Sequence, residues 1–154
     1  MVLPRFAGQF YEASNSKLQE QIKSCFKNEL GPGALPLKRS DRPLRGIIVP
    51  HAGYEFSGPC ASWAYKDMAE SKAYKTVVIL APDHNGRYEF PTTTTDELDT
   101  PLGTVMVNKS FVTNLSKKCP FLKVDHLAEH AVEVQLPFLQ FVNADIKNLM
   151  VVPI

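Results

Sequence analysis

The sequence lacks several features that would point to particular classes of protein. Its 154 residues include three cysteines, an odd number without a CxxC spacing, so a reduced, cytosolic setting fits best. The net charge is +1 and no basic run is present, which leaves no field to attract nucleic acid or an acidic membrane. The longest apolar runs are too short to cross a bilayer, and the N-terminus shows no secretory-signal pattern.

The composition is that of one folded domain. Hydrophobic residues make up 44% and charged residues 21% of the chain, and the length suits a single domain over residues 1–154. Three short apolar runs are predicted to be strands: Gly46–Pro50, Thr76–Ala81 and Leu149–Ile154. Between the first two, the apolar residues of Ser57–Ser71 recur at helical spacing and predict a helix. Runs that are apolar on both faces are typical of parallel strands covered by helices. The sequence therefore predicts an α/β fold with an open, mostly parallel sheet flanked by helices.

Three further helices are predicted outside this βαβ unit. Ser14 or Ser16 can cap a helix near the N-terminus through its hydroxyl oxygen. Asn108 can cap a second helix in the same way. The third runs over Glu129–Val142, and Pro137 is expected to strain or kink its middle because proline lacks the backbone N–H.

Two histidines come soon after the first two predicted strands. His51 directly follows one strand and His84 lies three residues past the other. Ligands of open α/β sheets bind beyond the carboxyl ends of the strands, so these imidazoles can meet at one metal ion. Asp83 could orient an imidazole or cap its own turn. The alternative is that the histidines are unrelated, one on a turn and the other paired with Asp83.

A second group of polar residues opens the predicted C-terminal helix. Glu129 and Glu133 share a helical face, and His130 and Glu133 have the spacing of a metal-ligating or acid–base pair. The alternative is a solvated helix start, with Glu129 near the positive end of the helix dipole. Tyr54 is a candidate pocket wall or acid, and Arg5 could bind an anion.

Five segments in order resemble motifs of the Memo family. They are Arg5–Tyr11 (R-x-A-G-x-[FW]-Y), Pro50–Gly58 (PHAGY-x-[FY]-SG), Ala81–His84 (G-P-x-H), Asp99–Gly103 (TPLG) and Glu129–Leu139 (EHS-[IL]-E-x-Q-[LM]-P-[FY]-L). The sequence departs from these motifs at Ala81, where glycine is usual, and at Ala131, where serine is usual. The order and spread of the motifs make the resemblance specific.

The resemblance implies a fold like that of the class III extradiol dioxygenases, which hold non-haem iron. It implies His51 and His84 as metal ligands, with Fe(II) or Cu as the metal, and His130 and Tyr54 lining the pocket. The family's other ligands and its acid–base histidine come from later segments, past Ile154. The chain is therefore expected to be a fragment, the N-terminal part of a single Memo-like domain. Its site is expected to be incomplete and to hold metal weakly.

The resemblance leaves two functions open. One is a metal-dependent redox enzyme of the extradiol dioxygenase type, acting on a small molecule. The other is a non-catalytic adaptor with a vestigial pocket for a phosphopeptide, where Arg5 and the helix amino terminus after Gly53 would hold the anion. The family also implies a radical-SAM protein as partner. Neither nucleic acid nor a membrane is expected as a partner, and the expected location is cytoplasmic.

Overall fold

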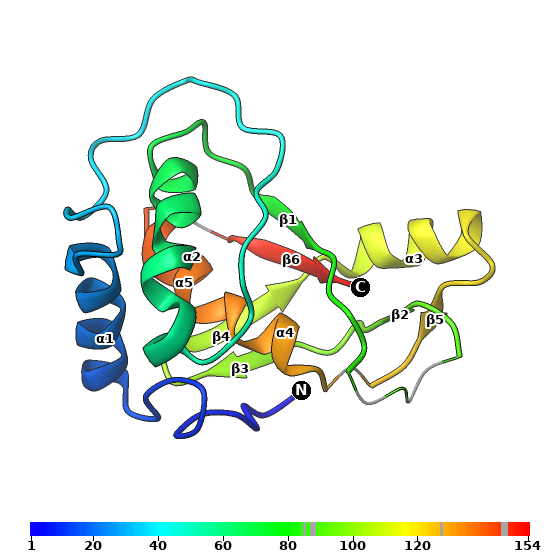
Figure 1. The fold of residues 1–154 in the computed structure, drawn as a ribbon. Coiled ribbons are helices and arrows are strands. Elements are labelled where there is room, and N and C mark those ends of the chain that lie inside the picture. The colour runs from blue at the N-terminus through cyan, green and yellow to red at the C-terminus, as the bar shows by residue number, and fades with distance from the viewer. Residues whose placement is uncertain (85, 87–88, 127, 146–147) are drawn as a thin grey trace.

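The computed structural model describes residues 1–84, 86, 89–126, 128–145 and 148–154. Figure 1 shows a central sheet with α1, α2 and α5 gathered on one side of the molecule and α3 on the other. The described part of the chain therefore has the α/β architecture, with helices flanking a sheet, that the sequence predicts.

The central sheet has four strands, three of them parallel. In spatial order they are β1 (Thr76–Ile79), β6 (Met150–Pro153), β4 (Gly103–Val107) and β3 (Leu98–Thr100). β3 is antiparallel to β4, and Val2 adds an isolated bridge to Leu98. A separate parallel pair joins β2 (Thr92–Thr93) to β5 (Lys123–Val124). The predicted strands at Thr76–Ala81 and Leu149–Ile154 are confirmed as β1 and β6.

In the described part of the chain, five helices lie beside the sheet. They are α1 (Asn15–Lys27), α2 (Tyr54–Ala69), α3 (Lys109–Lys118), α4 (His130–Glu133) and α5 (Gln135–Val142). Ser14 caps α1 by accepting from Lys17 N–H, and Asn108 caps α3 by accepting from Phe111 N–H. Both caps are as predicted. Among the described helices, none is long and apolar enough to cross a membrane.

The predicted single helix over 129–142 is wrong, because the structure divides it into α4 and α5. Val134 is the residue between them. Pro137 lies in the first turn of α5, and without an N–H it cannot bond the carbonyl of Glu133 four residues earlier. The expected strain at Pro137 therefore takes the form of a break at the preceding turn.

The predicted strand over Gly46–Pro50 is also wrong. This segment pairs with no strand in the described part of the chain. Ile47 and Val49 pack against the core, whereas Ile48 between them is 99% exposed. A cavity of about 780 Å³ separates the segment from β1, so the two cannot form a ladder. The apolar run therefore marks an extended segment that packs against the core, and it does not indicate that the segment pairs with a strand.

Helix packing on one side of the sheet builds the core. Tyr65 of α2 stacks on Phe138 of α5 with ring centroids 4.8 Å apart. Phe26 of α1 meets the same Phe138 ring edge-on at 6.0 Å. All three rings are buried, so α5 is fixed against both neighbours. This packing also fixes α4, which directly precedes α5 and carries His130.

Candidate metal centre

Three histidines from distant parts of the chain meet at one place. His51 lies in the loop before α2, His84 in the turn after β1, and His130 opens α4. Ring centroids are 4.9 Å apart for His51 and His84, 4.3 Å for His84 and His130, and 5.9 Å for His51 and His130. One nitrogen from each ring lies within 4.8 Å of the others, a grouping that could hold a metal ion. The predicted proximity of His51 and His84 is confirmed. His130 adds a third possible donor, a residue for which the sequence indicated a metal-ligating or acid–base pair with Glu133 and a place in the pocket lining.

A buried carboxylate orients two of these imidazoles. Glu129 Oε1 lies 3.0 Å from His84 Nδ1 and 2.8 Å from His130 Nδ1. Its Oε2 accepts the backbone N–H of His84 at 3.1 Å. Because the carboxylate engages both Nδ1 atoms, the Nε2 atoms are the ones available to a metal, as in the carboxylate–histidine–metal arrangement. The sequence suggested Asp83 for this orienting role, and the structure shows Glu129 in it.

The protonation states suit metal binding. Burial would raise the pKa of the Glu129 carboxyl, but hydrogen bonds from Ala131 N–H and His84 outweigh it, and the pKa falls below its ordinary value. Burial lowers the pKa of His130, and the neighbouring histidines lower it further, despite the opposing charge of Glu129. At neutral pH the carboxylate is therefore charged and the His130 imidazole neutral, which is the form that binds metals.

Two hydrogen bonds tie the His51 loop to the α4–α5 junction. The Tyr54 hydroxyl donates to the Val134 carbonyl at 2.7 Å, and the Gln135 side-chain amide donates to the Pro50 carbonyl at 3.2 Å. Tyr65 donates to the Gln135 side-chain oxygen at 2.7 Å and so fixes that amide. Tyr54 is 3% exposed, and burial raises its pKa well above the ordinary value. These contacts give Tyr54 a positioning role, while its predicted role as an acid stays a prediction.

Glu133 anchors the N-terminal segment beside the histidines. Its carboxylate accepts the backbone N–H groups of Arg5 and Phe6, at 3.0 Å and 2.9 Å, and the Tyr11 hydroxyl at 2.7 Å. These are charge-assisted bonds to a largely buried group, the stronger kind of hydrogen bond. The first motif of the sequence is thus held on α4 by a residue of the last motif.

The anchored segment forms an aromatic wall against His130. The Phe6 ring lies 5.5 Å from the His130 ring and the Phe10 ring 4.9 Å from it. The Phe10 carbonyl accepts the N–H of Tyr54 at 2.7 Å, which joins the segment to the His51 loop as well. The sequence interpretation missed this wall, although the paired aromatics of Arg5–Tyr11 were a visible signal for it.

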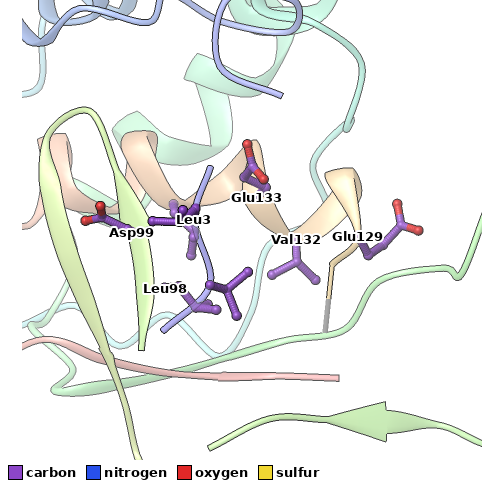
Figure 2. A pocket seen from close by; sticks show the side chains of 8 residues that line it. Leu3, Leu98, Asp99, Glu129, Val132 and Glu133 are labelled. Atoms are coloured by element: carbon purple, nitrogen blue, oxygen red, sulfur yellow. The ribbon is translucent and has the colours of Figure 1, made fainter. Parts of the chain in front are cut away.

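The interpretation of Glu129 and Glu133 as a solvated helix start is wrong, since their exposed fractions are 6% and 9%. Figure 2 shows both carboxylates projecting from α4 on one side, with Val132 directed the other way. The cavity in that view has a volume of only about 20 Å³, which suits a single water. This cavity is therefore too small for an organic ligand.

The fold and the histidine cluster define an α/β protein with a candidate metal centre beyond the carboxyl end of β1. Residues 3–154 match the family model described as Memo-like protein, so the chain belongs to the Memo family. It is 49% identical over 145 residues to a MEMO1 family protein of Methanopyrus kandleri, covering 90% of this chain and 51% of that protein. It is 37% identical over 155 residues to one of Methanothermobacter thermautotrophicus, covering 98% and 55%. The chain spans about half the length of the curated relatives it matches.

Proposed function

We propose that the protein binds one Fe(II) or Cu ion through His51, His84 and His130. We further propose that the centre serves a metal-dependent redox reaction of the extradiol dioxygenase type. The observation that supports this most directly is the cluster of three imidazoles, two of them oriented by the buried Glu129 carboxylate. Imidazole nitrogen is a ligand that suits both metals. Three protein ligands leave coordination positions open, as catalytic sites do.

Different residues of the chain would bind the ion, orient its ligands and exclude water from the centre. The three imidazoles would bind the ion, and Glu129 would keep two rings in the tautomer that presents Nε2. Phe6 and Phe10 would exclude water from one side of His130. A bound ion would supply Lewis-acid and redox chemistry toward dioxygen or a substrate hydroxyl. The substrate and any radical-SAM partner belong to the whole protein and remain proposals.

The adaptor function receives less support from these contacts. The helix amino terminus after Gly53 was the candidate anion site, yet the Tyr54 N–H donates to the Phe10 carbonyl. Glu55 also places a carboxylate in the first turn of α2, where it would repel a phosphate. We therefore favour the metal centre as the function of this site.

Metal titration of single histidine variants tests the proposal. Wild-type protein should bind one equivalent of Fe(II), under anaerobic conditions, or of Cu, by calorimetry and elemental analysis. His51→Ala, His84→Ala and His130→Ala should each weaken binding by at least about tenfold, because each removes one donor. His126→Ala is the matched control, since His126 lies outside the cluster, with Nδ1 3.6 Å from Asp96. Binding that survives all three substitutions would rule the centre out.

A further inference from the structure

The side chain of Gln135 joins the two backbone segments that carry His51 and His130. Its amide nitrogen donates to the Pro50 carbonyl and to the Ala131 carbonyl, each at 3.2 Å. Pro50 directly precedes His51, and Ala131 directly follows His130. One amide group therefore bridges the chain beside two of the three candidate metal ligands.

A buried tyrosine fixes the orientation of this amide. The Tyr65 hydroxyl donates to Gln135 Oε1 at 2.7 Å. In the opposite orientation the amide oxygen would face the carbonyl oxygens of Pro50 and Ala131, and two hydrogen bonds would be lost. Both Gln135 and Tyr65 are buried, and hydrogen bonds are stronger where water is excluded. Both donors and the acceptor of the amide are thus used in a single arrangement.

Different groups hold the two sides of the histidine cluster. Glu129 contacts the Nδ1 atoms of His84 and His130, whose ring centroids lie 4.3 Å apart. The His51 ring lies 5.9 Å from the His130 ring, and Gln135 connects these two residues through the backbone beside each of them. The position of His51 relative to the pair that Glu129 holds therefore depends on Gln135.

We propose that Gln135 is a positioning residue of the metal centre, and that it sets the separation of His51 from His130. It acts through the backbone next to each histidine, and Tyr65 acts through it. The inference rests on the proposed metal-binding function, although the ring positions can be measured without metal. Packing alone would not require this amide, because an apolar side chain of similar size would fill the space without the cost of burying polar groups.

Ring contacts in the metal-free protein test the inference first. In the wild type, nuclear Overhauser contacts between ring protons should join His51 to His130 and His84 to His130. Gln135→Met keeps the length of the side chain but removes its three hydrogen bonds, so the contact between His51 and His130 should be lost. The contact between His84 and His130 should remain, because Glu129 still holds both rings.

Gln140→Met is the matched control on the same helix. The Gln140 amide also uses both of its ends, since it accepts from the Thr100 hydroxyl at 2.7 Å and donates to the Gly103 carbonyl at 2.9 Å. These partners lie on β3 and β4, and neither adjoins a histidine in the sequence. This variant should therefore keep both ring contacts.

Tyr65→Phe is a milder second variant, which carries the test if Gln135→Met unfolds. It removes only the hydroxyl that orients the amide, and the ring can stay stacked on Phe138. The contact between His51 and His130 should weaken in this variant. Denaturant unfolding of each variant identifies those that remain folded.

Copper affinity in double-mutant cycles separates positioning from a general loss of structure. Gln135→Met should weaken Cu(II) binding by about tenfold, both in the wild type and in a His84→Ala background. In a His51→Ala or His130→Ala background it should have little further effect, because one of the two ligands that it spaces is already missing. Cu(II) suits these weakened sites, since it binds nitrogen ligands more tightly than the other divalent metals of the first transition row.

Three results would overturn the inference. They are a contact between His51 and His130 that survives both Gln135→Met and Tyr65→Phe, a loss of both ring contacts together in Gln135→Met, and a loss of affinity that is equal in all three histidine backgrounds. A wild type that binds no metal would instead contradict the proposed function, and the ring contacts would still decide the role of Gln135.

Discussion

Glu129 and Glu133 show how two buried carboxylates on one short helix can serve different parts of a site. Glu129 binds the Nδ1 atoms of two histidines, and Glu133 binds two backbone N–H groups and the Tyr11 hydroxyl. A buried charge is tolerated only when such partners satisfy it. Each carboxylate therefore ties a separate segment to α4, the turn after β1 in one case and the N-terminal segment in the other.

At this scale we predict the effect of Glu129→Gln. The amide has the same shape as the carboxylate but lacks its charge. It therefore loses the charge-assisted contacts that Glu129 makes with the Nδ1 atoms of His84 and His130. The affinity for Fe(II) or Cu should fall by about 10- to 100-fold, which is typical when a partner of a metal-binding histidine is lost. Calorimetric titration measures this change. Glu29→Gln is the control, because Glu29 is exposed and far from the cluster in sequence. Equal affinities for the two variants would contradict an orienting role.

At the scale of elements, α1 and α2 approach closely because Gly58 has no side chain. A Cβ at Gly58 would lie 2.4 Å from Cys25 Sγ, well inside contact distance. We expect Gly58→Ala to lower the free energy of unfolding. The clash costs about 1–3 kcal/mol, against a gain of up to about 1 kcal/mol from helix propensity. Denaturant unfolding measures the net change.

Two comparisons sharpen that test. Gly46→Ala places a Cβ where no atom lies within 4 Å, so it should leave stability nearly unchanged. Adding Cys25→Ala to Gly58→Ala removes the sulfur that causes the clash, so part of the lost stability should return. A stabilising effect of Gly58→Ala alone would mean that the helices can separate without cost.

Elements with local signals were predictable, and contacts between elements were not. The caps at Ser14 and Asn108 depend on side chains within three residues, so the sequence shows them directly. The strand expected at Gly46–Pro50 failed because an apolar run cannot say whether a ladder partner lies beside it. His130 reaches the other two histidines only through the packing of α4, and Glu133 bonds Arg5 across 128 positions of sequence. The spacing of His130 and Glu133 indicated a polar site on this helix, but it could not show which distant segments the two side chains contact.

At the scale of the whole molecule, the reactivity of the free cysteines can show how the core unfolds. Cys60 is exposed on α2, whereas Cys25 is buried where α1 packs against α2. Burial raises the pKa of the Cys25 thiol to about 11. Because the thiolate is the reactive form, Cys25 at pH 8 is protected both by its low ionisation and by its lack of contact with solvent.

We therefore predict two separate alkylation reactions in a Cys119→Ser background at pH 8. Cys60 should react rapidly in the native protein, and Cys60→Ser should remove that fast reaction. Cys25 should react only as α1 leaves α2, so its labelling should follow denaturant with the same midpoint as the loss of helical circular dichroism. Cys25 belongs to the same buried cluster as Tyr54 and Phe138, so a shared midpoint would show that the helices around the histidine site unfold as one unit. Labelling of Cys25 well below that midpoint would instead show that α1 opens on its own.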